Sequence, residues 1–144
     1  MRIIIEDLQP GEEEEIIIKV KRTTENILRA IELFKQPNDL TVYLDDQALL
    51  LPPSDIFYIE TVDLKTFVYG ENKIFKSKLK LYEIEELLID GDFLRISKQT
   101  LLNFRKIQSV SPSGAGRFQA TLINNEKVII SRQYVPKLKE VFGL

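Results

Sequence analysis

The stretch from residue 93 to residue 107 reads Phe93-Leu94-Arg95-Ile96-Ser97-Lys98-Gln99-Thr100-Leu101-Leu102-Asn103-Phe104-Arg105-Lys106-Ile107. Two largely apolar segments are separated by the polar cluster Ser-Lys-Gln-Thr. A Lys-Gln pair is not expected to interrupt a half-buried strand or short helix unless the pair is exposed to a binding partner. The stretch also holds four Lys and Arg residues and no acid. Basic, amide and hydroxyl groups on a short turn suit phosphate oxygens and base edges, so this stretch favours contact with DNA.

The composition limits the classes of function. The 144 residues are enough for one domain, or one domain with an appendage. The chain contains no cysteine and no histidine. It therefore has no disulfide, no thiolate zinc site, and neither the usual general base nor the commonest metal ligand. We expect no enzyme activity, no cofactor, no metal and no small-molecule substrate.

The N-terminus indicates the compartment. Only Ile3, Ile4 and Ile5 form an apolar run before acids appear at Glu6 and Asp7, which does not resemble a signal peptide. No apolar run approaches the roughly 20 residues that a membrane span needs. We therefore expect a cytoplasmic protein.

The net charge of −2 conceals an asymmetry along the chain. Residues 1–55 hold 6 Lys and Arg against 12 Asp and Glu, a net charge of −6. Residues 56–144 hold 14 against 10, a net charge of +4. Such a split hints at a nucleic-acid-binding part joined to an acidic part. Chance, together with the run of four glutamates at 12–15, is the plainer explanation.

The N-terminal residues predict a small β-β-α unit, which we assign to residues 1–40. Arg2–Glu6 and the β-branched run Ile16–Lys21 are the expected strands. Thr23 or Thr24 can cap a following amphipathic helix, which Pro37-Asn38 ends. The unit is too small to be stable alone. One hypothesis is that its helix, Thr24–Lys35, forms a dimer contact.

Residues 41–144 predict a second, mainly β domain. The expected strands are Thr41–Leu44, Ala48–Leu51, Ile56–Val62, Thr66–Tyr69, Lys73–Ser77, Arg117–Ile123 and Lys127–Ile130. A short amphipathic helix is expected over Leu81–Leu88, a turn over Ser111–Gly116, and a final helix over Tyr134–Phe142 that Ser131 can cap. The fold class is therefore α+β with strands dominating.

Three loops carry the candidate binding residues. These are Lys65 and Thr66 after the strand Ile56–Val62; Ser97, Lys98 and Gln99; and Arg132 with Gln133. A Gln amide can bond an adenine edge, Lys can reach guanine or phosphate, and Arg can fork onto guanine. Arg132 at a helix start also opposes the helix dipole, which an anionic partner would relieve. Each loop also has a plainer explanation: solvation of Lys65 and Lys98, an Arg95–Asp92 pair, or pairing of Arg132 with Glu126 or Asp92.

Residues from about 41 to 144 resemble a LytTR-type DNA-binding domain. The matching features are Ile56–Thr61, Phe93–Lys98 with Leu101-Leu102-Asn103 and Ile107, and Val128–Val135 with Leu138-Lys139. The resemblance implies an elongated stack of small β-sheets with short helices, whose loops enter successive major grooves at two direct repeats in promoters. Carried over by position, Lys65 or Thr66, Lys98 with Ser97 and Gln99 beside it, and Arg132 would contact bases.

The N-terminus departs from the most familiar members, because a short β-β-α unit stands where they carry a receiver domain. The resemblance is then to stand-alone regulators that a partner controls, a membrane protein being one candidate. We expect a transcriptional regulator that binds double-stranded DNA as a homodimer or on tandem repeats. The competing hypothesis is that the protein is a protein-interaction module, which acts through the acidic N-terminal unit and does not bind DNA.

Overall fold

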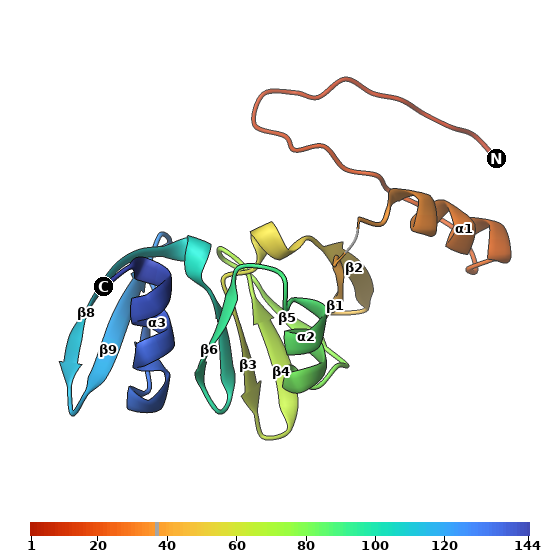
Figure 1. Cartoon of the computed structure of the whole chain (residues 1–144). Coiled ribbons are helices and arrows are strands. Elements are labelled where there is room, and N and C mark those ends of the chain that lie inside the picture. Colours follow the sequence, from red (N-terminus) through yellow and green to blue (C-terminus); the bar gives the residue numbers. More distant parts are fainter. Residues whose placement is uncertain (37) are drawn as a thin grey trace. The chain divides into compact units, whose positions relative to one another are not determined.

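The computed structural model describes residues 1–36 and 38–144, in two compact units, Met1–Phe34 and Lys35–Leu144 (Figure 1). Unit 1 contains the helix α1 (Glu25–Phe34). Unit 2 contains β1 (Leu40–Leu44), β2 (Gln47–Leu51), β3 (Tyr58–Val62), β4 (Lys65–Tyr69), β5 (Ile74–Ser77), α2 (Leu81–Leu87), β6 (Phe93–Ser97), β7 (Thr100–Asn103), β8 (Ile107–Gly114), β9 (Arg117–Leu122), β10 (Lys127–Ile130) and α3 (Val135–Phe142). Three short 3₁₀ turns, η1 (Pro53–Asp55), η2 (Phe104–Lys106) and η3 (Arg132–Tyr134), complete it. The predicted mainly β class is confirmed.

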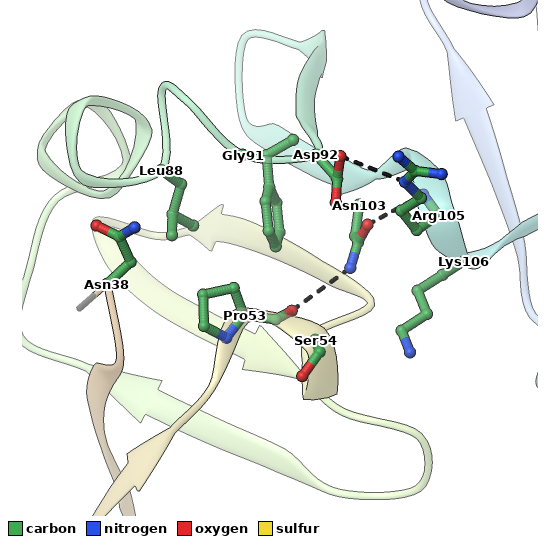
Figure 2. A pocket seen from close by; sticks show the side chains of 10 residues that line it. Asn38, Pro53, Ser54, Leu88, Gly91, Asp92, Asn103, Arg105 and Lys106 are labelled. Atoms are coloured by element: carbon green, nitrogen blue, oxygen red, sulfur yellow. Dashed lines mark hydrogen bonds and ion pairs between the residues drawn. The ribbon is translucent and has the colours of Figure 1, made fainter. Parts of the chain in front are cut away.

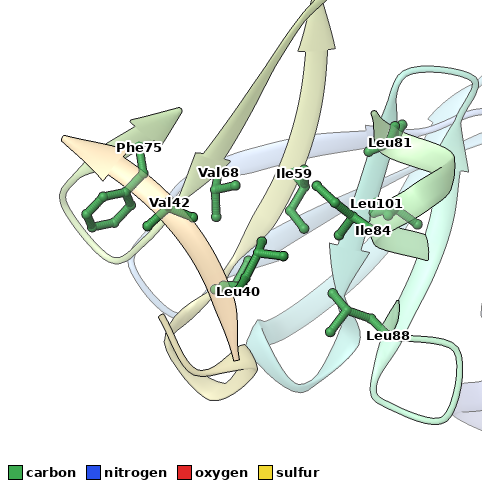
Figure 3. Packing of buried hydrophobic residues seen from close by; sticks show 10 residues of the cluster. Leu40, Val42, Ile59, Val68, Phe75, Leu81, Ile84, Leu88 and Leu101 are labelled. Carbon is green, nitrogen blue, oxygen red and sulfur yellow. The ribbon is translucent and has the colours of Figure 1, made fainter. Parts of the chain in front are cut away.

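Unit 2 is built on a seven-stranded and a three-stranded antiparallel sheet, ordered β2-β1-β5-β4-β3-β7-β6 and β10-β9-β8. The helix α2 packs on the larger sheet through Leu81 and Ile84, which are buried because they recur at helical spacing. Figure 3 shows them beside Leu101 and Ile59, in one cluster with further inward-facing residues of the strands such as Val42 and Val68. Alternate strand residues supply this core.

A second apolar cluster joins the two sheets. Ile96 of β6, Leu122 of β9 and Leu138 of α3 are among its buried members. The backbone N–H of Ser131, which follows β10, donates to the carbonyl of Ile96 at 2.8 Å. The small sheet and α3 are therefore fixed against β6 and the large sheet (Figure 1).

The buried Asn103 holds the junction at one end of β7. Its amide nitrogen donates to the carbonyl of Ile56 at 2.9 Å, and its amide oxygen accepts from the N–H of Arg105 at 3.0 Å.

Two tyrosines of the large sheet stack on each other: the ring centroids of Tyr58 and Tyr69 lie 4.2 Å apart. Burial, followed by the nearby Glu60 carboxylate, raises the pKa of Tyr69.

Two predicted elements near the C-terminus are corrected by the structure. The turn expected over Ser111–Gly116 is shorter, because β8 continues to Gly114 and only Ala115 and Gly116 connect it to β9. Pro112 is tolerated because β8 is an edge strand. The last helix begins at Val135, and the Ser131 side chain makes no capping hydrogen bond.

The β-β part of the predicted β-β-α unit was wrong for this single chain. Residues 1–24, all of which the structure describes, contain no strand, and every one of them is exposed. A two-stranded hairpin is marginal in water unless a third strand or a helix covers its apolar face. The helix was predicted correctly, and the Thr24 hydroxyl accepts from the N–H of Ile27 at 3.4 Å at its start.

Candidate nucleic-acid interface

The turn between β3 and β4 presents the first candidate loop. Val62 pairs with Lys65, so Asp63 and Leu64 alone form the turn, at φ 50° and 65°. This is the geometry of tight hairpins, whose two central residues both take positive φ. Lys65 is exposed at the start of β4, but Thr66 is only 6 % exposed. Thr66 therefore faces the interior, and its assignment to the binding surface is corrected.

The turn between β6 and β7 presents the second candidate loop. Ser97 pairs with Thr100, which leaves Lys98 and Gln99 exposed as the two turn residues. The Ser97 hydroxyl accepts from the N–H of Gln99 at 3.2 Å and so stabilises the turn. Lys98 and Gln99 project from a geometrically defined hairpin.

Arg95 supports this turn and does not extend the basic surface. Its Nε lies 3.0 Å from Oε2 of Glu85 in α2, and its Nη2 lies 3.1 Å from the other carboxylate oxygen. Its Nη1 donates to the carbonyl of Lys98 at 2.6 Å. A forked pair of this kind is geometrically specific and neutralises the cation. The Arg95 partner is thus Glu85, whereas Asp92 pairs with Arg105 at 3.3 Å.

The third loop is the junction between β10 and α3. Arg132 and Gln133 are both exposed and lie in η3, one turn before α3 begins. Within the described ranges 1–36 and 38–144, Arg132 forms no ion pair with Glu126 or Asp92. Burial, followed by the Glu126 carboxylate, raises the pKa of Tyr58.

Gly116 supports the side chain of Arg132, a contact that has no local signal in the sequence. A Cβ atom placed on Gly116 would lie 2.7 Å from Cδ and 2.9 Å from Cγ of Arg132. Gly116 also takes φ +77°, which favours glycine. The turn between β8 and β9 is therefore a fourth loop at the site, and it brings the exposed Arg117 with it.

Backbone contacts bring these loops to one edge of unit 2. The N–H of Thr61 donates to the carbonyl of Gln99 at 2.9 Å, which joins the first loop to the second. The bond from Ser131 to Ile96 joins the second to the third, and Gly116 joins the third to the fourth. Figure 1 shows the turns β3–β4, β6–β7 and β8–β9 along the lower edge of the ribbon.

The charge at this edge is positive. Lys65, Lys98, Arg117 and Arg132 are exposed there, and Asp63 is the acid in the turns. These four cations form no ion pair with any residue that the structure describes. An edge of free cations separated by short turns is suited to successive phosphates with base edges between them.

A cavity of about 260 Å³ lies at the other end of β3 and β7, beside Asn103 (Figure 2). Its basic side chains are engaged: Arg105 pairs with Asp92, and the Lys106 ammonium lies 5.0 Å from the centre of the Phe57 ring. It holds none of the predicted binding residues. The described part of the chain also offers no cluster of acids that could hold a metal ion.

Among the helices in the described residues, none is long and apolar enough to cross a membrane.

Comparisons with known proteins match this architecture. The chain is 27% identical over 142 residues to the sensory transduction protein LytT of Enterococcus faecalis, covering 95% of this chain and 59% of that relative. It is 26% identical over 122 residues to an uncharacterised HTH-type transcriptional regulator of Staphylococcus aureus, covering 85% and 82%. This chain thus spans little more than half the length of the first relative.

A solved structure matches most of the chain. It is the LytTr DNA-binding domain of a Bacillus cereus protein described as a methyl-accepting/DNA response regulator. The match has a TM-score of 0.69 and 27% identity, and it covers 74% of this chain and 97% of that one. The family model described as LytTr DNA-binding domain matches residues 46–143. The chain therefore belongs to the LytTr DNA-binding domain family.

Proposed function

We propose that this protein is a cytoplasmic, sequence-specific transcriptional regulator that reads direct repeats in promoter DNA. The observation that carries the proposal is the meeting of the predicted loops at one edge with four exposed cations, none of which forms an ion pair among the described residues. Phosphate contacts supply most of the affinity in such an interface, and a few base contacts supply the sequence preference.

The loops have separate roles in this proposal. Arg132 forks onto the O6 and N7 atoms of a guanine in the major groove, with Gln133 beside it. Lys98 reaches a guanine or a phosphate, and Gln99 bonds an adenine edge. Lys65 binds a phosphate. Ser97 acts through the turn that it stabilises.

Replacing Arg132 with alanine tests the base contact. We expect Arg132→Ala to weaken binding by about 1–3 kcal/mol and to relax the preference at one base pair. The measurement is fluorescence anisotropy with the double-stranded DNA upstream of the protein's own gene, beside scrambled DNA, across a salt series. The charge-matched control is Lys73→Ala, since Lys73 lies beyond the opposite end of β4. Unchanged affinity and site preference for Arg132→Ala would exclude the assigned role.

Replacing Gly116 with alanine tests how Arg132 is positioned. An added Cβ would displace the arginine stem, so affinity should fall toward that of Arg132→Ala, and the double variant should lose nothing further. Gly114→Ala is the matched control, because Gly114 also has positive φ, +86°, but has open space around it. Equal losses from both glycine variants would show that backbone strain is the cause, with no role for the Arg132 contact.

We further propose that unit 1 forms a homodimer. Its apolar side chains are exposed in the single chain, among them Ile3, Ile4, Ile5, Leu8, Ile16, Ile17, Ile18, Val20, Leu28, Leu33 and Phe34. Contiguous exposure on this scale is rare in monomers and is typical of association surfaces. The two β-branched segments also lack partner strands, which a second copy would supply.

The charges of unit 1 suit a second copy of the same chain. Residues 1–15 carry six acids and one arginine, whereas residues 16–24 carry three cations and no acid. Pairing the first segment of one chain with the second segment of another brings opposite charges together, twice in a symmetric dimer. A regulatory membrane protein, the other partner that the family resemblance implies, would act on this assembly.

A charge-swap experiment on the full-length chain tests the dimer. The variant Lys19→Glu with Lys21→Glu leaves net charges of −5 on residues 1–15 and −1 on residues 16–24, and the variant Glu13→Lys with Glu14→Lys and Glu15→Lys leaves +1 and +3. Each should sediment mainly as a monomer, because both segments then carry like charge. Their mixture should recover a dimer. Lys73→Glu with Lys76→Glu, in unit 2, is the control for total charge. A dimer that persists in each variant alone would place the contact elsewhere.

The alternative function is a protein-interaction module without a DNA role, and the exposed apolar surface of unit 1 is the observation that favours it. The two readings differ in the anisotropy experiment. A regulator prefers its own upstream DNA over scrambled DNA, whereas an interaction module with a basic edge binds both weakly and equally.

A further inference from the structure

Leu64, at the tip of the β3–β4 turn, combines two unfavourable features. Its side chain is 95 % exposed, so it contributes almost nothing to the apolar core. Its backbone has φ 65°, which crowds the Cβ of an L-residue and is costly for a bulky side chain. Asn or Gly would adopt this conformation more easily. Folding alone therefore does not account for a leucine here.

The other turns of the chain follow the expected preference. Among the described residues, the remaining side chains at positive φ belong to Asn38, Asp45, Asp63, Ala115 and Asn125. All are small, and all but Ala115 are polar. Leu64 is the exception, and it lies on the edge that carries the free cations.

The residues around Leu64 indicate which group of a bound DNA its side chain would contact. The adjacent Lys65 is exposed, and the Thr61–Gln99 hydrogen bond holds this turn beside the Lys98 turn. A tip flanked by phosphate-binding cations would reach the base edges between the strands of the duplex. In the major groove the apolar group on a base edge is the C5-methyl of thymine.

We propose that Leu64 contacts a thymine methyl in the major groove and so determines sequence preference at that base pair. The proposal rests on the DNA-binding function proposed above. It adds an apolar contact to an interface otherwise made of cations and amides, and it gives a reason for the conformational cost of a leucine at this position.

Two variants of the same residue separate binding from folding. Leu64→Asn removes the apolar contact and relieves the strain, so its thermal unfolding midpoint should rise while its affinity for DNA falls. Leu64→Ala removes the contact and keeps the positive φ, so affinity should fall without that rise. The expected loss is about fourfold, as for burying one methyl-sized group.

Removing the methyl from the DNA completes the test. In the shortest duplex from the protein's own upstream DNA that binds, each thymine is replaced in turn by deoxyuridine. For the wild-type protein one replacement should weaken binding about fourfold, and for Leu64→Asn the same replacement should have no effect.

The outcomes distinguish the two proposals. If the wild-type protein prefers this DNA and Arg132→Ala weakens binding, but both Leu64 variants bind like the wild type or respond equally to every replacement, the Leu64 contact is refuted and the DNA-binding function stands. If the wild-type protein shows no preference for this DNA over scrambled DNA, the proposed function and the Leu64 contact both fail.

Discussion

The apolar cluster that joins the two sheets is the constraint on which the rest of the structure depends. Ile96, Leu102, Leu122, Ile130 and Leu138 are each 2 % exposed or less, and they come from both sheets and from α3. Close packing of this kind leaves little freedom for one sheet to slide over the other. The hydrogen bond from Ser131 to Ile96 then sets the position of the β10–α3 junction against β6.

The candidate interface follows from that constraint and from short turns. The β3–β4, β6–β7 and β8–β9 connections have two residues each, so the side chains at their tips are fixed by strand register. Residues from four distant parts of the sequence reach one edge without a recognition helix. The forked Arg95–Glu85 pair and the glycine under Arg132 orient individual side chains within that edge. Placing binding groups on strand ends gives them the precision of the scaffold.

Most strands of unit 2 and the positions of its turns could be predicted from local sequence. The predictions that were wrong or missing have physical causes. Apolar runs rich in β-branched residues marked most strands of unit 2, and the polar break at Lys98-Gln99 marked a turn. The burial of Thr66 depends on which face of β4 points inward, which the core decides. The contact between Gly116 and Arg132 depends on the docking of α3 and has no signal nearby in the chain. Strand propensity at Ile16–Lys21 was outweighed by the lack of a partner strand.

The most direct test of the central account is to map DNA contacts on the full-length chain by NMR. Amide chemical shifts of the ¹⁵N-labelled protein would be recorded as the double-stranded DNA upstream of its own gene is added. If the four loops contact DNA, the largest changes will occur at residues 63–65, 97–99, 115–117 and 131–133, and the residues of the cavity beside Asn103 will be unaffected. Changes centred on that cavity or on unit 1, with the four loops unchanged, would contradict it.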